Sequence, residues 1–146
     1  MKPMANAPPN YVKLRLTAPD GLIETPWAER IGDKFRLDNL PWYAYGISDN
    51  DLVDAVATDV EGIFDFVRVV SPSGNRLIRV IFEDGHYQSM LDQLHAMGCH
   101  YEGFNKKFFA VSIPLHVALD DVTQLLTRSG LQWELANPTY GDLPPG

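Results

Sequence analysis

Cys99 is the side chain best suited to nucleophilic chemistry, because it is the only cysteine and two histidines lie close to it in sequence. A thiolate nucleophile needs a base within hydrogen-bond reach. His95 precedes Cys99 by one helical turn, but Gly98 is expected to end that helix between them, and His100 alternates to the opposite side of a strand. We therefore expect a buried thiol that packs as a small apolar residue.

Motifs for metals and cofactors are absent. His95, Cys99 and His100 offer three donors to zinc, but no fourth follows at a familiar spacing. No glycine-rich phosphate-binding motif occurs, and we expect residues 71–74 to form a plain turn. The sequence thus predicts no metal, no cofactor and no enzymatic activity. An enzyme would require scattered carboxylates and His86 to converge in one pocket.

Acidic residues are concentrated between Leu37 and Val67, a segment without lysine or arginine. Its Asp49-Asn50-Asp51 run resembles the start of a calcium-binding loop, but Asp54 and Val60 replace the glycine and glutamate that such a loop needs. We expect a negatively charged surface instead. Its residues would be Asp49, Asp51, Asp54, Asp59, Glu61 and Asp65.

Trp42, Tyr43 and Tyr45 follow Pro41 in a turn-rich corner of the chain. On one interpretation they fill the seam between two halves of the protein together with Trp27, because large amphipathic rings bury area while keeping a polar group available. On the other, at least one stays exposed beside the acidic residues and anchors a protein partner, since interface hot spots favour Trp and Tyr. We expect Trp27 itself in the core.

Composition and charge limit the classes of partner. The chain has 146 residues, 45% of them hydrophobic, and a net charge of −7. Nucleic-acid binding depends on neutralising phosphates with lysine and arginine, so we expect none; the acidic balance favours a basic protein partner. One cysteine, no apolar signal segment and no run of about 20 apolar residues predict a cytoplasmic protein without membrane contact.

The first half of the chain is predicted to be rich in strands. Residues 11–17 alternate apolar and basic side chains, as a strand with one solvated face does, and Gly32-Asp33 is expected to be a tight hairpin turn. The pattern favours a small bent sheet or partial barrel over residues 11–73. The predicted strands are residues 11–17, 24–31, 34–37, 52–57 and 63–70.

In the second half, apolar residues recur at helical spacing in two segments, the first with Asp84 near its start, and glycines follow both segments. The β-α-β-β-α-β order is the ferredoxin-like pattern, which we assign to residues 74–136, with a flexible leader over residues 1–10 and a loose tail over residues 137–146. The predicted fold class is α+β. The predicted elements are strand 76–82, helix 87–97, strands 99–104 and 107–113, helix 120–129 and strand 131–135.

Several short motifs carry a family resemblance: Trp27-Ala-Glu29, Arg36–Trp42, Gly46-Ile-Ser48, Asp51-Leu-Val53, Arg68-Val-Val70, Ser73-Gly74, Leu77–Val80, Gly98-Cys99 and Val111–Pro114. With them the chain resembles a bacterial domain-of-unknown-function family, number 4265, from Tyr11 to Glu134. Pro26 and Trp42 stand where that family has Leu and Phe. The resemblance implies a fold, but it transfers no catalytic residues because the family has none established.

These features favour a non-enzymatic immunity protein that neutralises a co-encoded bacterial toxin by occluding its basic active site. The acidic residues would face the basic cleft of the toxin, and an aromatic residue of the corner would be the desolvated anchor. The alternative is a regulatory module whose ferredoxin-like half senses a small ligand, which residues 83–85 between its first predicted strand and helix indicate. The predicted partner-binding residues are Trp42, Tyr43, Tyr45, Asp49, Asp51, Asp54, Asp59, Glu61 and Asp65.

Overall fold

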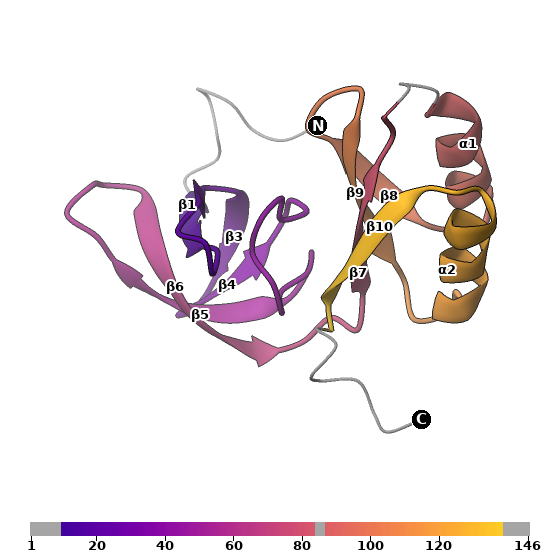
Figure 1. The fold of residues 1–146 in the computed structure, drawn as a ribbon. Coiled ribbons are helices and arrows are strands. Elements are labelled where there is room, and N and C mark those ends of the chain that lie inside the picture. The colour runs from indigo at the N-terminus through magenta and orange to yellow at the C-terminus, as the bar shows by residue number, and fades with distance from the viewer. Residues whose placement is uncertain (1–9, 84–86, 139–146) are drawn as a thin grey trace.

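Six strands of the N-terminal half form a barrel-like sheet in the computed structural model, which describes residues 10–83 and 87–138 (Figure 1). They are β1 (Tyr11–Thr17), β2 (Ile23–Glu24), β3 (Trp27–Ile31), β4 (Lys34–Leu37), β5 (Leu52–Ala57) and β6 (Ile63–Ser71). The sheet order is β2-β1-β3-β4-β5-β6, and the sheet closes because β1 also pairs with β6 in parallel. The alternation in β1 sets the inside of the barrel, where Val12, Leu14 and Leu16 are buried.

The C-terminal half is an antiparallel sheet with two helices on one face (Figure 1). Its elements are β7 (Arg76–Ile81), α1 (Gln88–Ala96), β8 (His100–Gly103), β9 (Phe108–Ile113), α2 (Leu119–Arg128) and β10 (Gln132–Asn137). The strand order is β10-β7-β9-β8. α1 ends where Gly98 adopts a positive φ of 105°, which favours glycine because it has no side chain to clash with the backbone.

Each face of the C-terminal sheet packs against a different layer. Ile78 and Val80 of β7 face the helices and join a core with Leu94 and Leu126. The residues that alternate with them in β7 face away from the helices. Of these, Leu77 packs in a second cluster with Leu40, Ala110, Ala136 and Trp42. The connection between β4 and β5 therefore lies between the barrel and the C-terminal sheet, and Gly46 N donates a hydrogen bond to Ala136 O at 2.8 Å.

The mixed α+β class, dominated by sheet with a barrel-like half and two helices, is confirmed. One expected strand is wrong: residues 24–31 divide into β2 and β3, because Pro26 has no N–H to donate to the sheet. Trp27 is half-buried rather than core, with the Lys13 ammonium 5.1 Å from its ring centroid. Asp84, expected near the start of the first helix, and His86 lie outside the described residues.

The division into subdomains at residue 73 stays a prediction, as do the leader and the tail, which fall mostly outside the described residues. One residue assigned to that tail, Asn137, ends β10. Within the described residues, no helix is long and apolar enough to cross a membrane.

Candidate binding cleft

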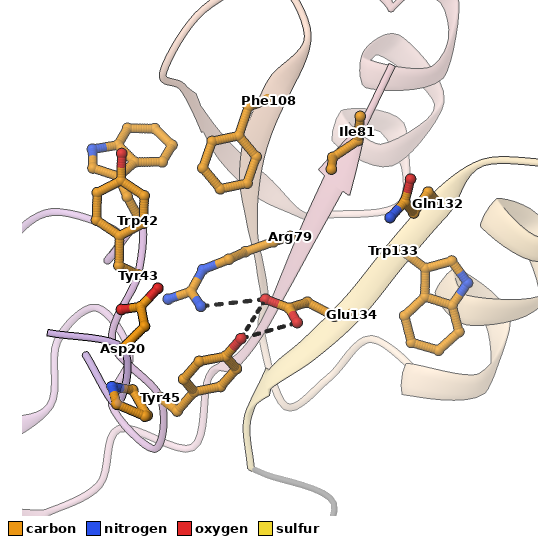
Figure 2. Close-up of a pocket in the computed structure, with 11 residues that line it drawn as sticks. Asp20, Trp42, Tyr43, Tyr45, Arg79, Ile81, Phe108, Gln132, Trp133 and Glu134 are labelled. Atoms are coloured by element: carbon orange, nitrogen blue, oxygen red, sulfur yellow. Dashed lines mark hydrogen bonds and ion pairs between the residues drawn. The ribbon is translucent and has the colours of Figure 1, made fainter. Parts of the chain in front are cut away.

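The register of the C-terminal sheet builds the floor of a cleft on the face away from the helices. Arg79 of β7 pairs with Glu134 of β10, and Ile81 pairs with both Gln132 and Phe108. Because side chains alternate along strands, all five project from the same face (Figure 2). The floor therefore combines a cation, a carboxylate and an apolar strip.

The aromatic corner forms the opposite wall. Trp42 and Tyr43 contact the ring of Phe108, with centroid distances of 5.9 and 6.5 Å, and Tyr45 lies beside Arg79 (Figure 2). Between this wall and the floor lies a cavity of about 440 Å³. The residues around this seam cleft are Pro19, Asp20, Trp42, Tyr43, Tyr45, Arg79, Ile81, Phe108, Gln132, Trp133 and Glu134.

Opposite charges hold the aromatic corner on its two sides. The buried carboxylate of Glu24 accepts hydrogen bonds from the backbone N–H groups of residues 42, 43 and 44, at 2.6, 2.7 and 2.9 Å. On the other side, Arg79 donates to the carbonyl oxygens of Pro41 and Ala44. Buried backbone groups need such partners, so these two side chains replace the regular structure that this loop lacks.

Arg79 is only 3% exposed, and its charge is balanced within the cleft. Its Nη1 lies 3.6 Å from Glu134 Oε1, an ion-pair distance, and forms no hydrogen bond among the described residues. Burial lowers the pKa of Arg79, while the Glu134 and Glu24 carboxylates oppose that effect. Tyr45 donates its hydroxyl to Glu134 at 2.8 Å, and this bond, with burial, raises the pKa of Tyr45.

The three predicted aromatic anchors are brought together by the structure, since Trp42, Tyr43 and Tyr45 all line the seam cleft. Trp42 and Tyr43 are half-buried, and Tyr45 is 42% exposed. The rings therefore pack in the seam and still present surface, while their role as anchors for a partner stays a prediction. Trp27, expected with them, is absent from the cleft lining.

The predicted acidic surface is wrong for Asp49 and Asp51, because both are buried. Asp49 accepts hydrogen bonds from Ser112 Oγ at 2.7 Å and from Ser48 Oγ at 3.0 Å. Asp51 accepts from the backbone N–H groups of Ser48 and Ser73, at 2.9 and 2.8 Å, and burial raises its pKa. These carboxylates tie the chain together instead of facing a partner.

Two further acidic residues are paired within the barrel. Asp54 accepts from Lys34 at 2.6 Å and from Arg68 at 2.9 Å, and these bonds hold its pKa below the usual range. Asp65 forms a two-pronged pair with Arg15, which likewise lowers the pKa of Asp65. Basic residues from outside the acidic segment, on β1, β4 and β6, thus compensate both carboxylates.

Asp59 and Glu61 remain exposed, but they lie far from the aromatic corner. They occupy the turn between β5 and β6, at the end of the barrel away from the helices (Figure 1). The aromatic corner and the exposed acidic residues therefore do not form the single surface that was expected, because the fold places the β5–β6 turn away from residues 42–45.

Reasoning from the sequence missed Asp20, Glu24, Arg79 and Glu134. Arg79 carried the clearest signal, since a charged residue inside the apolar run from Leu77 to Ile81 needs a buried partner. Nothing local marks Glu134 or Glu24, because their roles depend on which strands lie side by side.

Cys99 and the histidines near it form no catalytic arrangement. Cys99 is buried, and burial raises the pKa of its thiol to about 11, while His95 and His100 are both exposed. In the described part of the chain, no three His, Cys, Asp or Glu side chains are grouped so that they could hold a metal ion.

Comparison with known proteins gives a family and a fold. No curated protein matches the chain. A solved structure, described as "Novel crystal structure of a hypothetical protein from Neisseria gonorrhoeae", is similar with a TM-score of 0.72 and 17% identity, over 87% of this chain and 93% of that one. The sequence profile of the family described as "Domain of unknown function (DUF4265)" matches residues 24–135, a range that runs from Glu24 through Arg79 and Glu134, and the chain therefore belongs to that family.

Proposed function

We propose that this protein is a non-enzymatic binding protein of the cytoplasm, and specifically an immunity protein that neutralises a bacterial toxin by covering its basic active site. The observation that carries the proposal is the convergence of Trp42, Tyr43 and Tyr45 on one cleft beside the carboxylates of Asp20 and Glu134. Clustered, partly exposed aromatic rings around a concave site are typical of the centre of a protein interface.

The cleft changes how occlusion would work. The anchor is the seam cleft, and the negative charges nearest to it are Asp20 and Glu134 rather than the residues of the β5–β6 turn. The net charge of −7 would speed the encounter with a basic protein through long-range attraction, while the aromatic contacts would slow dissociation. Asp59 and Glu61 would contribute to the first of these effects only.

Affinity capture from native lysate tests the proposal. Tagged protein is expected to recover a basic protein in stoichiometric amount, and co-expression is expected to relieve the toxicity of that protein. Tyr43→Leu, which removes a ring from the cleft, should weaken capture, whereas Asp59→Asn, at the far end of the barrel, should leave it nearly unchanged. Recovery of the tagged protein alone would count against an immunity role.

A second candidate function is the sensing of a small ligand by the C-terminal half. We assign a ferredoxin-like unit to residues 74–136, an assignment that the β10-β7-β9-β8 order and the two helices on one face support. The cleft volume also falls within the range of about 300–1,000 Å³ that is usual for small-molecule sites. Native mass spectrometry discriminates the two functions, because a sensor would retain a ligand mass and an empty monomer would favour the immunity role.

A further inference from the structure

We infer that the seam cleft binds an arginine side chain of the partner, with the guanidinium group on the aromatic wall of the cleft and against the carboxylates of Asp20 and Glu134. The inference rests on the proposed function, since it takes this cleft as the contact site. It adds the chemistry that the cleft recognises.

The aromatic wall suits a flat cation. Tyr43 and Phe108 stack on each other with rings inclined by only 27° at a centroid distance of 6.5 Å, and together they present an aromatic wall to the cleft (Figure 2). A cation close to the face of such a ring is attracted by the negative charge of its π system. Guanidinium is planar and weakly hydrated, so it stacks on aromatic faces more readily than an ammonium group does.

The carboxylates at the cleft supply the opposite charge. Asp20 is exposed and accepts one hydrogen bond, from the backbone N–H of Leu22 at 3.2 Å. In the described part of the chain it has no ion pair within 4.0 Å. Glu134 is 47% exposed, so a ligand can approach it even while it pairs with Arg79. A carboxylate binds a guanidinium through two parallel hydrogen bonds, which gives direction as well as affinity.

Arg79 shows that the cleft already accommodates this group. Its guanidinium carbon lies 5.0 Å from the ring centroid of Tyr45, and Glu134 pairs with the same guanidinium. Arg79 does not compete for the outer part of the cleft, because it is buried and held by the carbonyls of Pro41 and Ala44. The cleft lining thus holds two carboxylates and one buried cation, and only Glu134 pairs with that cation, so a second cation is favoured at Asp20.

The test uses the full chain and capped amino acids as probes. N-acetyl-arginine-N-methylamide is titrated into labelled protein while backbone amide NMR signals are followed, and the citrulline analogue, which is neutral with the same shape, serves as the control. The arginine probe is expected to shift the signals of the cleft residues saturably, with an affinity at least about five-fold above that of citrulline. The lysine analogue should bind more weakly than arginine.

Matched variants locate the binding. Asp20→Asn keeps the turn and should weaken the arginine probe by about two- to five-fold, and Tyr43→Leu should weaken it by about the same factor. Asp59→Asn removes an equal charge elsewhere and should change nothing. Equal affinity for arginine and citrulline, tighter binding of lysine, or no effect of either cleft variant would overturn the inference.

The two proposals can fail separately. If lysate capture succeeds and depends on Tyr43 while the arginine probe does not bind, the inference is wrong and the cleft remains the contact site. If the probe binds as expected and no protein is captured, recognition of arginine stands and the immunity role is lost.

Discussion

At the scale of single residues, the polar groups inside this protein differ in how their burial is compensated. Glu24 accepts hydrogen bonds from three backbone N–H groups, and Arg79 contacts backbone carbonyls and Glu134. Each buried charge therefore has polar partners in the protein that replace water. Burial dominates at Cys99 and is opposed only in part by the charge of Arg76, so its neutral form is favoured. The chemistry of each group follows from its surroundings more than from its type.

The Cys99 thiol should be nearly inert in the folded protein. Burial raises its pKa from 9.0 to about 11, so at pH 8 the thiolate population falls by about a hundred-fold relative to an exposed cysteine. Labelling with a chromogenic disulfide reagent should therefore be at least about a hundred-fold slower in native protein than in protein unfolded with urea. Similar rates in both states would mean that the thiol is accessible.

The Asp54 pairs should support stability at neutral pH and not in acid. Lys34 and Arg68 lower the pKa of Asp54 in the folded state below its ordinary value of 3.8. Their stabilisation is therefore fully present above that value and is lost as the pH falls through the folded pKa. Asp54→Asn should be less stable than the parent at pH 7, and the difference should shrink below about pH 4. Urea unfolding of the variant and the parent at a series of pH values measures this difference in unfolding free energy.

Asp59→Asn is the control for that series. The Asp59 side chain is exposed, so the unfolding free energy of this variant should follow that of the parent protein at every pH. If Asp54→Asn keeps a constant deficit down to pH 2, the cost comes from lost packing rather than from the ion pairs.

At the scale of elements, the loop from Pro41 to Tyr45 depends on Glu24. Glu24→Gln leaves one acceptor oxygen and places an amide N–H₂ against backbone N–H groups, so at least one buried donor loses its partner. We expect a loss of about 1–3 kcal/mol of unfolding free energy, and a shift in the tryptophan fluorescence of the loop. Glu61→Gln, exposed and distant, should cost less than about 0.5 kcal/mol. Equal effects of the two variants would show that the loop is held in another way.

The elements themselves were readable from local patterns, but the contacts between them were not. Strand alternation in residues 11–17 and the helical spacing around Leu94 gave the correct elements because each pattern lies within one segment. The cleft joins β7, β9 and β10 to a loop more than 30 residues earlier, and no local pattern specifies that approach. The aromatic side of the site could be predicted from Trp42 and Tyr43, whereas its charged side could not, since Asp49 looks as solvent-exposed in sequence as Asp59 does.

At the scale of the whole molecule, the two sheets are tied by the connection between β4 and β5. Leu40 and Trp42 pack on the C-terminal sheet, and Asp49 reaches the same sheet through Ser112. Asp49 also accepts from Asn75 Nδ2 at 3.2 Å, in the segment that joins the two sheets. The cleft lies along this seam, so its shape depends on how firmly the halves are held together.

The barrel and the C-terminal sheet are therefore expected to unfold in one transition. Trp27 reports on the barrel and Trp133 on the C-terminal sheet, so variants that retain only one of them as the fluorescent residue should give coincident urea midpoints. Asp49→Ala should lower both midpoints together. A double-mutant cycle with Ser112→Ala should give a coupling of about 1–3 kcal/mol, because the hydrogen bond between them is buried and charge-assisted. Separate midpoints in the parent would mean that residues 11–73 fold as an independent subdomain, and the seam cleft would then be open to changes in shape when a partner binds.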